Sequence, residues 1–169
     1  MQNDATPAAF TAPPELDAAI SELITHYPQK RSASLMALHA VQERLGHVPQ
    51  EAIEWLATRL ELQPINLYEL VTFYPMFRQH PAGRYQIKIC RTLSCALGGS
   101  HELHEHFCRK LGLDPQHHGL QTTPDGRFSI EFVECLANCG TAPVMMCNDN
   151  FYEGVTPAKA DEILSKCRV

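Results

Sequence analysis

Residues 85–95 read YQIKICRTLSC, and this stretch carries the strongest signals for both the fold and the chemistry. Polar and apolar side chains alternate from Tyr85 to Ile89, which predicts a half-buried strand. Cys90 follows this strand directly, and Cys95 comes after it with four residues between the two. We expect the connection after the strand to fold back, so that both thiols face one point.

A second pair of cysteines repeats this arrangement further along the chain. Residues 128–133, FSIEFV, alternate as a strand should, and Cys135 and Cys139 follow with three residues between them. Four thiolates from two loops form a site that suits either zinc or an iron–sulfur cluster. Structural zinc sites favour about two residues between paired cysteines, whereas the wider loops here favour a [2Fe–2S] cluster. The spacing alone leaves zinc, or no metal, as open alternatives.

The remaining patterns around these pairs predict a small α/β layer. A turn at residues 80–84 precedes the first strand, and a helix is expected from about Gly99 to Leu111. A turn-rich loop separates that helix from the second strand. Two further strands are expected at residues 144–147 and 151–153, and Thr156 with Pro157 starts a last helix. This order indicates a sheet covered by helices over residues 80–169.

The first half of the chain has a different character. Residues 1–14 are rich in Ala, Pro and Thr and predict a disordered tail. Apolar residues at helical spacing then predict a compact bundle of about four helices over residues 15–79. Gly46 ends one of these helices, and Pro49 and Pro64 each open another.

Composition excludes several classes of function. The 169 residues carry a formal net charge of −5 without a long basic run, which argues against nucleic acid as a partner. No apolar stretch approaches the roughly 18 residues of a membrane span, and the N-terminal residues do not resemble a secretory signal. We therefore expect a cytoplasmic location, where the seven cysteines stay reduced and do not form a disulfide framework.

The other candidate residues have simpler interpretations. Cys108, Cys147 and Cys167 are expected to pack as small apolar side chains. His101 and His104 are expected on a solvated helix face, although their spacing could also suit a metal. Arg91 could offset negative charge at the cysteine site. The sequence contains no dinucleotide fingerprint, which argues against a complete NADH-dependent enzyme on this chain. It also contains no Cys-x-x-Cys pair, which argues against a thiol oxidoreductase. We therefore expect an electron carrier. Close approach of the backbone to the site is expected at Gly98, Gly99 and Gly140.

Three segments together resemble a known family. They are VTFYPMF at residues 71–77, HPAGRYQIKICRTLSC at residues 80–95 and ECLANCGTAPVMM at residues 134–146. They are similar to the small thioredoxin-like iron–sulfur subunits of respiratory complex I, the E-subunit family of NADH–quinone oxidoreductase. The resemblance runs from about residue 15 to the end of the chain.

The resemblance implies a helical N-terminal bundle followed by a thioredoxin-like domain with one [2Fe–2S] cluster. Its ligands would be Cys90, Cys95, Cys135 and Cys139, which fall on the four ligand positions of the family. FMN and NADH would bind to a partner flavoprotein subunit, beside further subunits of the peripheral arm. The complex would place the chain at the cytoplasmic side of the inner membrane, without insertion into it. The same module also serves NAD-reducing hydrogenases and NAD-dependent formate dehydrogenases. Thioredoxin-like folds further suggest a cis peptide bond before Pro143.

Overall fold

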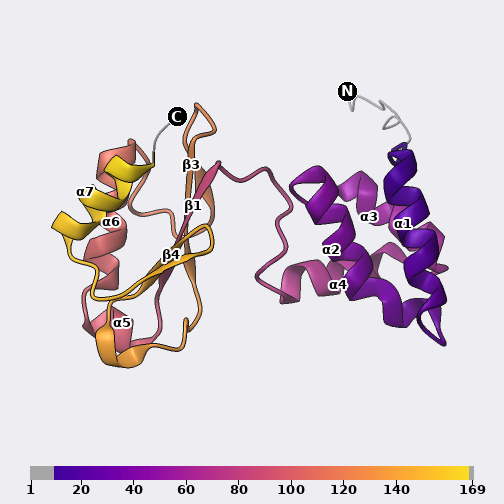
Figure 1. The fold of residues 1–169 in the computed structure, drawn as a ribbon, viewed down its shortest axis with the longest axis horizontal. Coiled ribbons are helices and arrows are strands. Elements are labelled where there is room, and N and C mark those ends of the chain that lie inside the picture. Colours follow the sequence, from indigo (N-terminus) through magenta and orange to yellow (C-terminus); the bar gives the residue numbers. More distant parts are fainter. Residues whose placement is uncertain (1–9, 168–169) are drawn as a thin grey trace, which may run out of the picture. The chain divides into compact units, whose positions relative to one another are not determined.

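A computed structural model describes residues 10–167, which form two compact units divided between Pro81 and Ala82 (Figure 1). Each unit is described by itself below. The predicted boundary at residues 79–80 lies close to this division. Most of the predicted N-terminal tail, residues 1–9, lies outside the described residues. Phe10, near the end of that predicted tail, packs against Trp55 with ring centroids 5.8 Å apart.

The first unit is helical, as predicted. Its helices are α1 (Pro14–Thr25), α2 (Ser34–Leu45), α3 (Gln50–Leu60) and α4 (Pro64–Phe73), with a short 3₁₀ turn, η1 (Lys30–Ala33), before α2. Prolines stand in the first turns of α1 and α4, where a missing N–H costs nothing. Gly46 ends α2 in the left-handed conformation, with φ of 79°. The fully buried apolar side chains that hold the four helices together include Ile20, Leu38, Val41, Ile53, Leu56, Leu60 and Leu67.

The second unit alternates strands and helices. In chain order it contains β1 (Tyr85–Cys90), α5 (Leu93–Leu97), α6 (Ser100–Leu111), β2 (Gln121–Thr122), β3 (Phe128–Val133), η2 (Cys139–Thr141), β4 (Met145–Cys147), β5 (Asn150–Tyr152) and α7 (Pro157–Lys166). The two long strands and both long helices lie where the sequence predicts them. The sequence did not predict β2, α5 or η2, each of which has at most five residues.

The sheet of this unit has the strand order β2-β3-β1-β4-β5. Strands β1 and β3 run parallel, with Cys90 opposite Val133 at their ends, and α6 lies in the connection between them. Strand β4 lies antiparallel on the other side of β1. Because β1 and β3 run in the same direction, the segments that follow them leave the sheet at the same end.

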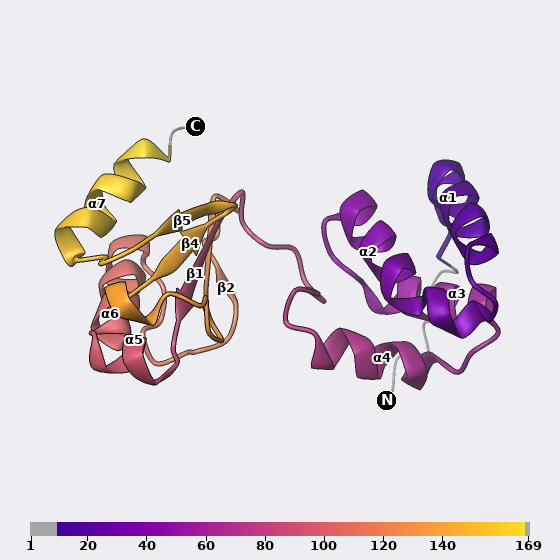
Figure 2. The same cartoon turned by 60° about the horizontal axis from the view of Figure 1, so that its bottom comes forward.

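Helices α6 and α7 contact each other beside the sheet (Figure 2). Ile87 and Ile89 of β1 lie opposite Ile130 and Phe132 of β3, so these apolar side chains share one face of the sheet. This face packs with Phe107 of α6 and with residues of α7. The Thr156 hydroxyl caps α7 by accepting a hydrogen bond of 3.2 Å from the N–H of Lys159.

Two further predictions concern the peptide bond before Pro143 and the absence of a membrane-spanning helix. The peptide bond between Ala142 and Pro143 is cis, as predicted. Within residues 10–167, every helix is too short or too polar to cross a membrane.

Candidate iron–sulfur site

The first cysteine pair is built on regular secondary structure. Cys90 is the last residue of β1 and Cys95 lies within α5, and each thiol residue is only 1% exposed. The N–H of Ala96 bonds the carbonyl of Thr92 at 2.9 Å, which turns the chain back after the strand. Cys90 and Cys95 pack with Val144 in a small apolar cluster of their own. The backbone on both sides therefore fixes the positions of these two thiols.

The second pair lies in the loop between β3 and β4, and both Cys135 and Cys139 are exposed. Ala137, midway between them, has φ of 62°, a conformation that L residues rarely adopt. This conformation directs the N–H of Ala137 at the sulfur of Cys135, with a nitrogen–sulfur distance of 3.3 Å. The loop thus supplies a backbone donor to one of its own thiols.

Contacts with the segment after β5 hold the second loop in place. The side-chain amide of Asn138 donates a hydrogen bond to the carboxylate of Glu153. The N–H of Gly154 donates to the carbonyl of Thr141 at 2.7 Å, and a similar backbone bond of 3.0 Å joins the N–H of Val155 to Pro143. The exposed pair is therefore supported by backbone and side-chain hydrogen bonds, whereas the first pair lies within regular elements.

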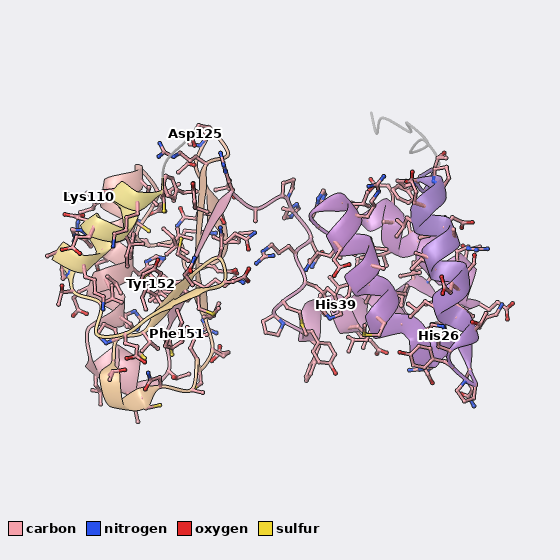
Figure 3. The ribbon with its side chains drawn as sticks, viewed as in Figure 1. His26, His39, Lys110, Asp125, Phe151 and Tyr152 are labelled. Carbon is pink, nitrogen blue, oxygen red and sulfur yellow. The ribbon has the colours of Figure 1, made fainter. Side chains whose placement is uncertain are left out.

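The two pairs meet at one end of the sheet. Figure 1 shows α5 and the segment after β3 at this end, and Figure 3 shows Asp125, in the β2–β3 connection, at the opposite end. A hydrogen bond from the N–H of Leu136 in the second loop contributes to the lowered pKa of Cys90, and negative charge on Cys139 contributes to the raised pKa of Cys95. Both cysteine-bearing segments therefore leave the sheet at the same end, and the convergence of all four thiols on one cluster stays a prediction.

Gly98 allows this close approach. A Cβ added at Gly98 would lie 2.9 Å from the Cβ of Ala142, closer than real Cβ contacts allow. Gly98 follows α5, and Ala142 follows η2, so this contact joins the two cysteine-bearing segments. An added Cβ at Gly140 would meet no protein atom within 4 Å, and the close approach of the backbone to the cluster that the sequence predicts at Gly140 stays a prediction.

The two buried thiols have opposite electrostatic environments. Burial by itself raises the pKa of Cys90, but hydrogen bonds from the Thr92 hydroxyl and from the N–H groups of Leu136 and Thr92 outweigh it, and the pKa falls below its usual range. Burial raises the pKa of Cys95, and negative charge on Cys90 and Cys139 raises it further, against a hydrogen bond to Val144. Several donors therefore already point at sulfur in this site.

The donor set fits an anionic iron–sulfur cluster. A [2Fe–2S] unit takes four thiolates, and hydrogen bonds to its sulfurs help to stabilise it. Here two loops supply four cysteines, together with backbone N–H groups from Leu136 and Ala137 that face sulfur. In the described part of the chain, no three His, Cys, Asp or Glu side chains are gathered as a site for a single metal ion.

The structure pairs Arg91 with a residue of the other loop rather than leaving it free. Arg91 Nε and Nη2 both donate to Glu134 Oε1, at 3.0 and 2.6 Å. The positive charge of Arg91, which we expected to offset negative charge at the cysteine site, is thus paired with the carboxylate of Glu134.

The histidine prediction needs a correction. His104 does not lie on a solvated face; it is 1% exposed and stacks on Phe132, with ring centroids 4.3 Å apart. His101 and His118 also pack against Phe132. Burial, and then the charges of His118 and His101, lower the pKa of His104 to about 4. The signal for this was present in the sequence, because His104 shares a helix face with the small residues Ser100 and Cys108.

The other three cysteines are buried, as predicted. Burial and the charge of Asp114 raise the pKa of Cys108 to about 11, and burial together with the neighbouring Cys167 raises that of Cys147 to about 12. These thiols lie in the apolar core between the sheet and its helices, away from the two cysteine loops.

Comparison with known proteins shows the family of this chain. The family model described as thioredoxin-like [2Fe-2S] ferredoxin matches residues 20–168, which is most of the chain. The chain belongs to the thioredoxin-like [2Fe–2S] ferredoxin family. The cofactor of this ferredoxin family is a [2Fe–2S] cluster, so the zinc alternative loses its support.

Relatives of this ferredoxin include subunits of a respiratory enzyme. The E subunit of NADH-quinone oxidoreductase from Aquifex aeolicus is 39% identical over 158 residues, which cover 93% of this chain and 96% of the relative. An E subunit of the same enzyme from Rhizobium meliloti is 37% identical, over 91% and 87% of the two chains. Among solved structures, an NAD+-reducing [NiFe]-hydrogenase matches with a TM-score of 0.65 and 25% identity. That match covers 79% of this chain and 22% of the hydrogenase chain.

Proposed function

We propose that this chain is the electron-transfer subunit of an NADH–quinone oxidoreductase and holds one [2Fe–2S] cluster through Cys90, Cys95, Cys135 and Cys139. The observation that carries the proposal is the meeting of two cysteine loops at one end of the sheet, with N–H donors facing sulfur. The similarity to the E subunit of Aquifex aeolicus, over almost the whole length of both chains, supports the choice of enzyme.

The cluster supplies one-electron storage when it is bound, and the chain controls its surroundings. Regular structure around Cys90 and Cys95 keeps water from one side of the site. The N–H groups of Leu136 and Ala137 offset the negative charge that accumulates on sulfur. Cys135 and Cys139 are exposed, so electrons enter and leave on their side.

A partner flavoprotein subunit that binds FMN and NADH is the proposed source of these electrons. Leu93 and Leu97, one helical turn apart on either side of Cys95, are 75% and 81% exposed. Large apolar side chains so exposed beside a redox site suit a protein interface. Ile65 and Phe73 of α4 are similarly exposed in the helical unit, which we propose also contacts the complex. Through that complex the chain would be peripheral to the membrane.

A second candidate is the equivalent subunit of an NAD+-reducing hydrogenase. The observation in its favour is the structural match to such an enzyme, in which this chain spans about a fifth of the matched chain. In either enzyme the chain would contribute electron transfer, and the complete active site would lie on partner subunits.

Reduction by NADH tests the proposal. The purified chain, alone and mixed with its cognate flavoprotein subunit under anaerobic conditions, is treated with NADH and frozen for EPR spectroscopy. We expect the S = 1/2 signal of a reduced [2Fe–2S] cluster only in the mixture, because the sequence of this chain contains no dinucleotide-binding fingerprint. A signal from the isolated chain with NADH, or none from the mixture, would contradict the proposed function. A colourless protein with one zinc would restore the zinc alternative.

A further inference from the structure

The ion pair between Arg91 and Glu134 joins the two cysteine loops. Arg91 follows Cys90 in the chain, and Glu134 precedes Cys135, so each charged residue is the direct neighbour of a proposed ligand. The guanidinium donates two hydrogen bonds to a single carboxylate oxygen, at 3.0 and 2.6 Å. The side chains are 50% and 62% exposed, so solvent reaches the pair.

The Arg91–Glu134 ion pair lies just beyond the last backbone hydrogen bond between β1 and β3. Cys90 lies opposite Val133 in the parallel register of β1 and β3. The N–H of Arg91 makes one more bond to the carbonyl of Val133, at 3.0 Å. Beyond this bond the two segments leave the sheet, the first toward Cys95 and the second toward Cys135 and Cys139. The Arg91–Glu134 side-chain bonds continue the connection past the last backbone bond of the ladder.

We propose that Arg91 and Glu134 are positioning residues, which form a clasp that fixes the separation of the two ligand loops. This inference rests on the proposed ligand set. An exposed ion pair contributes little to the stability of a whole protein. Here both side chains are anchored at the ends of paired strands, so the clasp acts on the local distance between Cys90 and Cys135. Without it, the exposed second loop separates more readily from the buried first pair.

The rate of cluster loss tests the clasp. The holoprotein is mixed anaerobically with an excess of an iron chelator, and the loss of visible absorption is followed for wild type, Arg91→Gln, Glu134→Gln and the double variant. We expect each single variant to lose its cluster roughly two- to five-fold faster than wild type, the range that an exposed ion pair contributes. The double variant should be no faster than either single variant, because both remove the same interaction.

The design separates a clasp from a simple effect of charge. Removing Arg91 takes a positive charge from the neighbourhood of an anionic cluster, and removing Glu134 takes a negative one. A pure charge effect would therefore change the two rates in opposite directions. Arg109→Gln serves as the matched control, since it breaks the exposed Arg109–Glu105 pair on α6, which joins no ligand loop. Circular dichroism confirms that each variant remains folded.

The outcomes are distinct. Faster loss in both single variants, no additivity in the double variant and a wild-type rate in Arg109→Gln would support the clasp. Unchanged rates, opposite changes or additive changes would overturn it and leave the ligand assignment intact. A wild-type protein that binds no iron and sulfide would contradict the ligand assignment, and the clasp with it.

Discussion

The two cysteine pairs of the site are held in different ways. Cys90 and Cys95 belong to a strand and a helix and are almost completely buried, whereas Cys135 and Cys139 lie exposed in a loop. The loop depends on a strained residue, Ala137, and on hydrogen bonds to the segment after β5. In the proposed site, the buried pair would be protected from solvent and the exposed pair would face the partner.

This comparison predicts unequal responses to the same substitution, and the largest effect is expected at the ligands themselves. Serine can replace a thiolate ligand only if the backbone moves to compensate for its shorter side chain. We expect Cys95→Ser to lose nearly all cluster, because β1 and α5 hold its backbone. Cys139→Ser should keep a measurable fraction with an altered spectrum. Iron and sulfide analysis with visible spectroscopy measures both, and equal losses would remove the proposed difference in rigidity.

The second largest effect is expected on stability at low pH, through His104 and the strand β3 that leads to Cys135 and Cys139. His104 stacks under Phe132 of β3 with a pKa of about 4, against 6.5 for an ordinary histidine. Between these values the unfolded chain binds a proton that the folded chain does not. The free energy of unfolding should therefore fall as the pH drops from 6.5 to 4, by up to about 3 kcal/mol, and His104 should have no effect above pH 6.5.

Urea unfolding, followed by circular dichroism at several pH values, measures this dependence. His104→Phe keeps an aromatic ring at the site and removes the titrating group, so its stability should fall less steeply over the same interval. His101 and His118 both pack against Phe132 and remain in both proteins, which isolates the effect of His104. Equal slopes would show that His104 does not carry the acid sensitivity.

The third effect tests the contact between the two cysteine-bearing segments. Gly98→Ala places a Cβ 2.9 Å from Ala142, so α5 and the segment after η2 must move apart. We expect a loss of about 1–3 kcal/mol in the free energy of unfolding, the usual cost of overpacking, together with faster loss of the cluster. Gly140→Ala is the matched control, because its Cβ meets no atom within 4 Å. Similar behaviour of the two variants would contradict the contact.

The smallest expected effect is a gain in thermal stability. Ala137→Gly relieves the left-handed conformation of Ala137, at the expense of a more flexible unfolded chain. We expect the melting temperature to rise slightly, which corresponds to less than about 1 kcal/mol. Ala96→Gly, in α5, should instead lower it, because glycine weakens a helix. A loss of stability in Ala137→Gly would indicate that Ala137 makes contacts that outweigh its strain.

Much of this site follows from the sequence, and the parts that do not have identifiable causes. Alternating residues predicted β1 and β3 within one residue of their ends, and the cysteine spacing indicated two loops. The two-residue strand β2 has too few residues to show any periodicity. The Arg91–Glu134 pair depends on the parallel register of β1 and β3, which places Cys90 opposite Val133. That register is a property of the folded sheet and is not present in any local pattern.

The ligand set is the central claim, and EPR spectroscopy of seven single cysteine-to-alanine variants tests it most directly. Each variant is purified anaerobically and reduced with dithionite, and its S = 1/2 signal is measured beside its iron content. We predict loss of the signal for Cys90, Cys95, Cys135 and Cys139. Variants at Cys108, Cys147 and Cys167 should retain it while they remain folded. A full wild-type signal in any of the first four variants, or a folded member of the other three without cluster, would contradict the account.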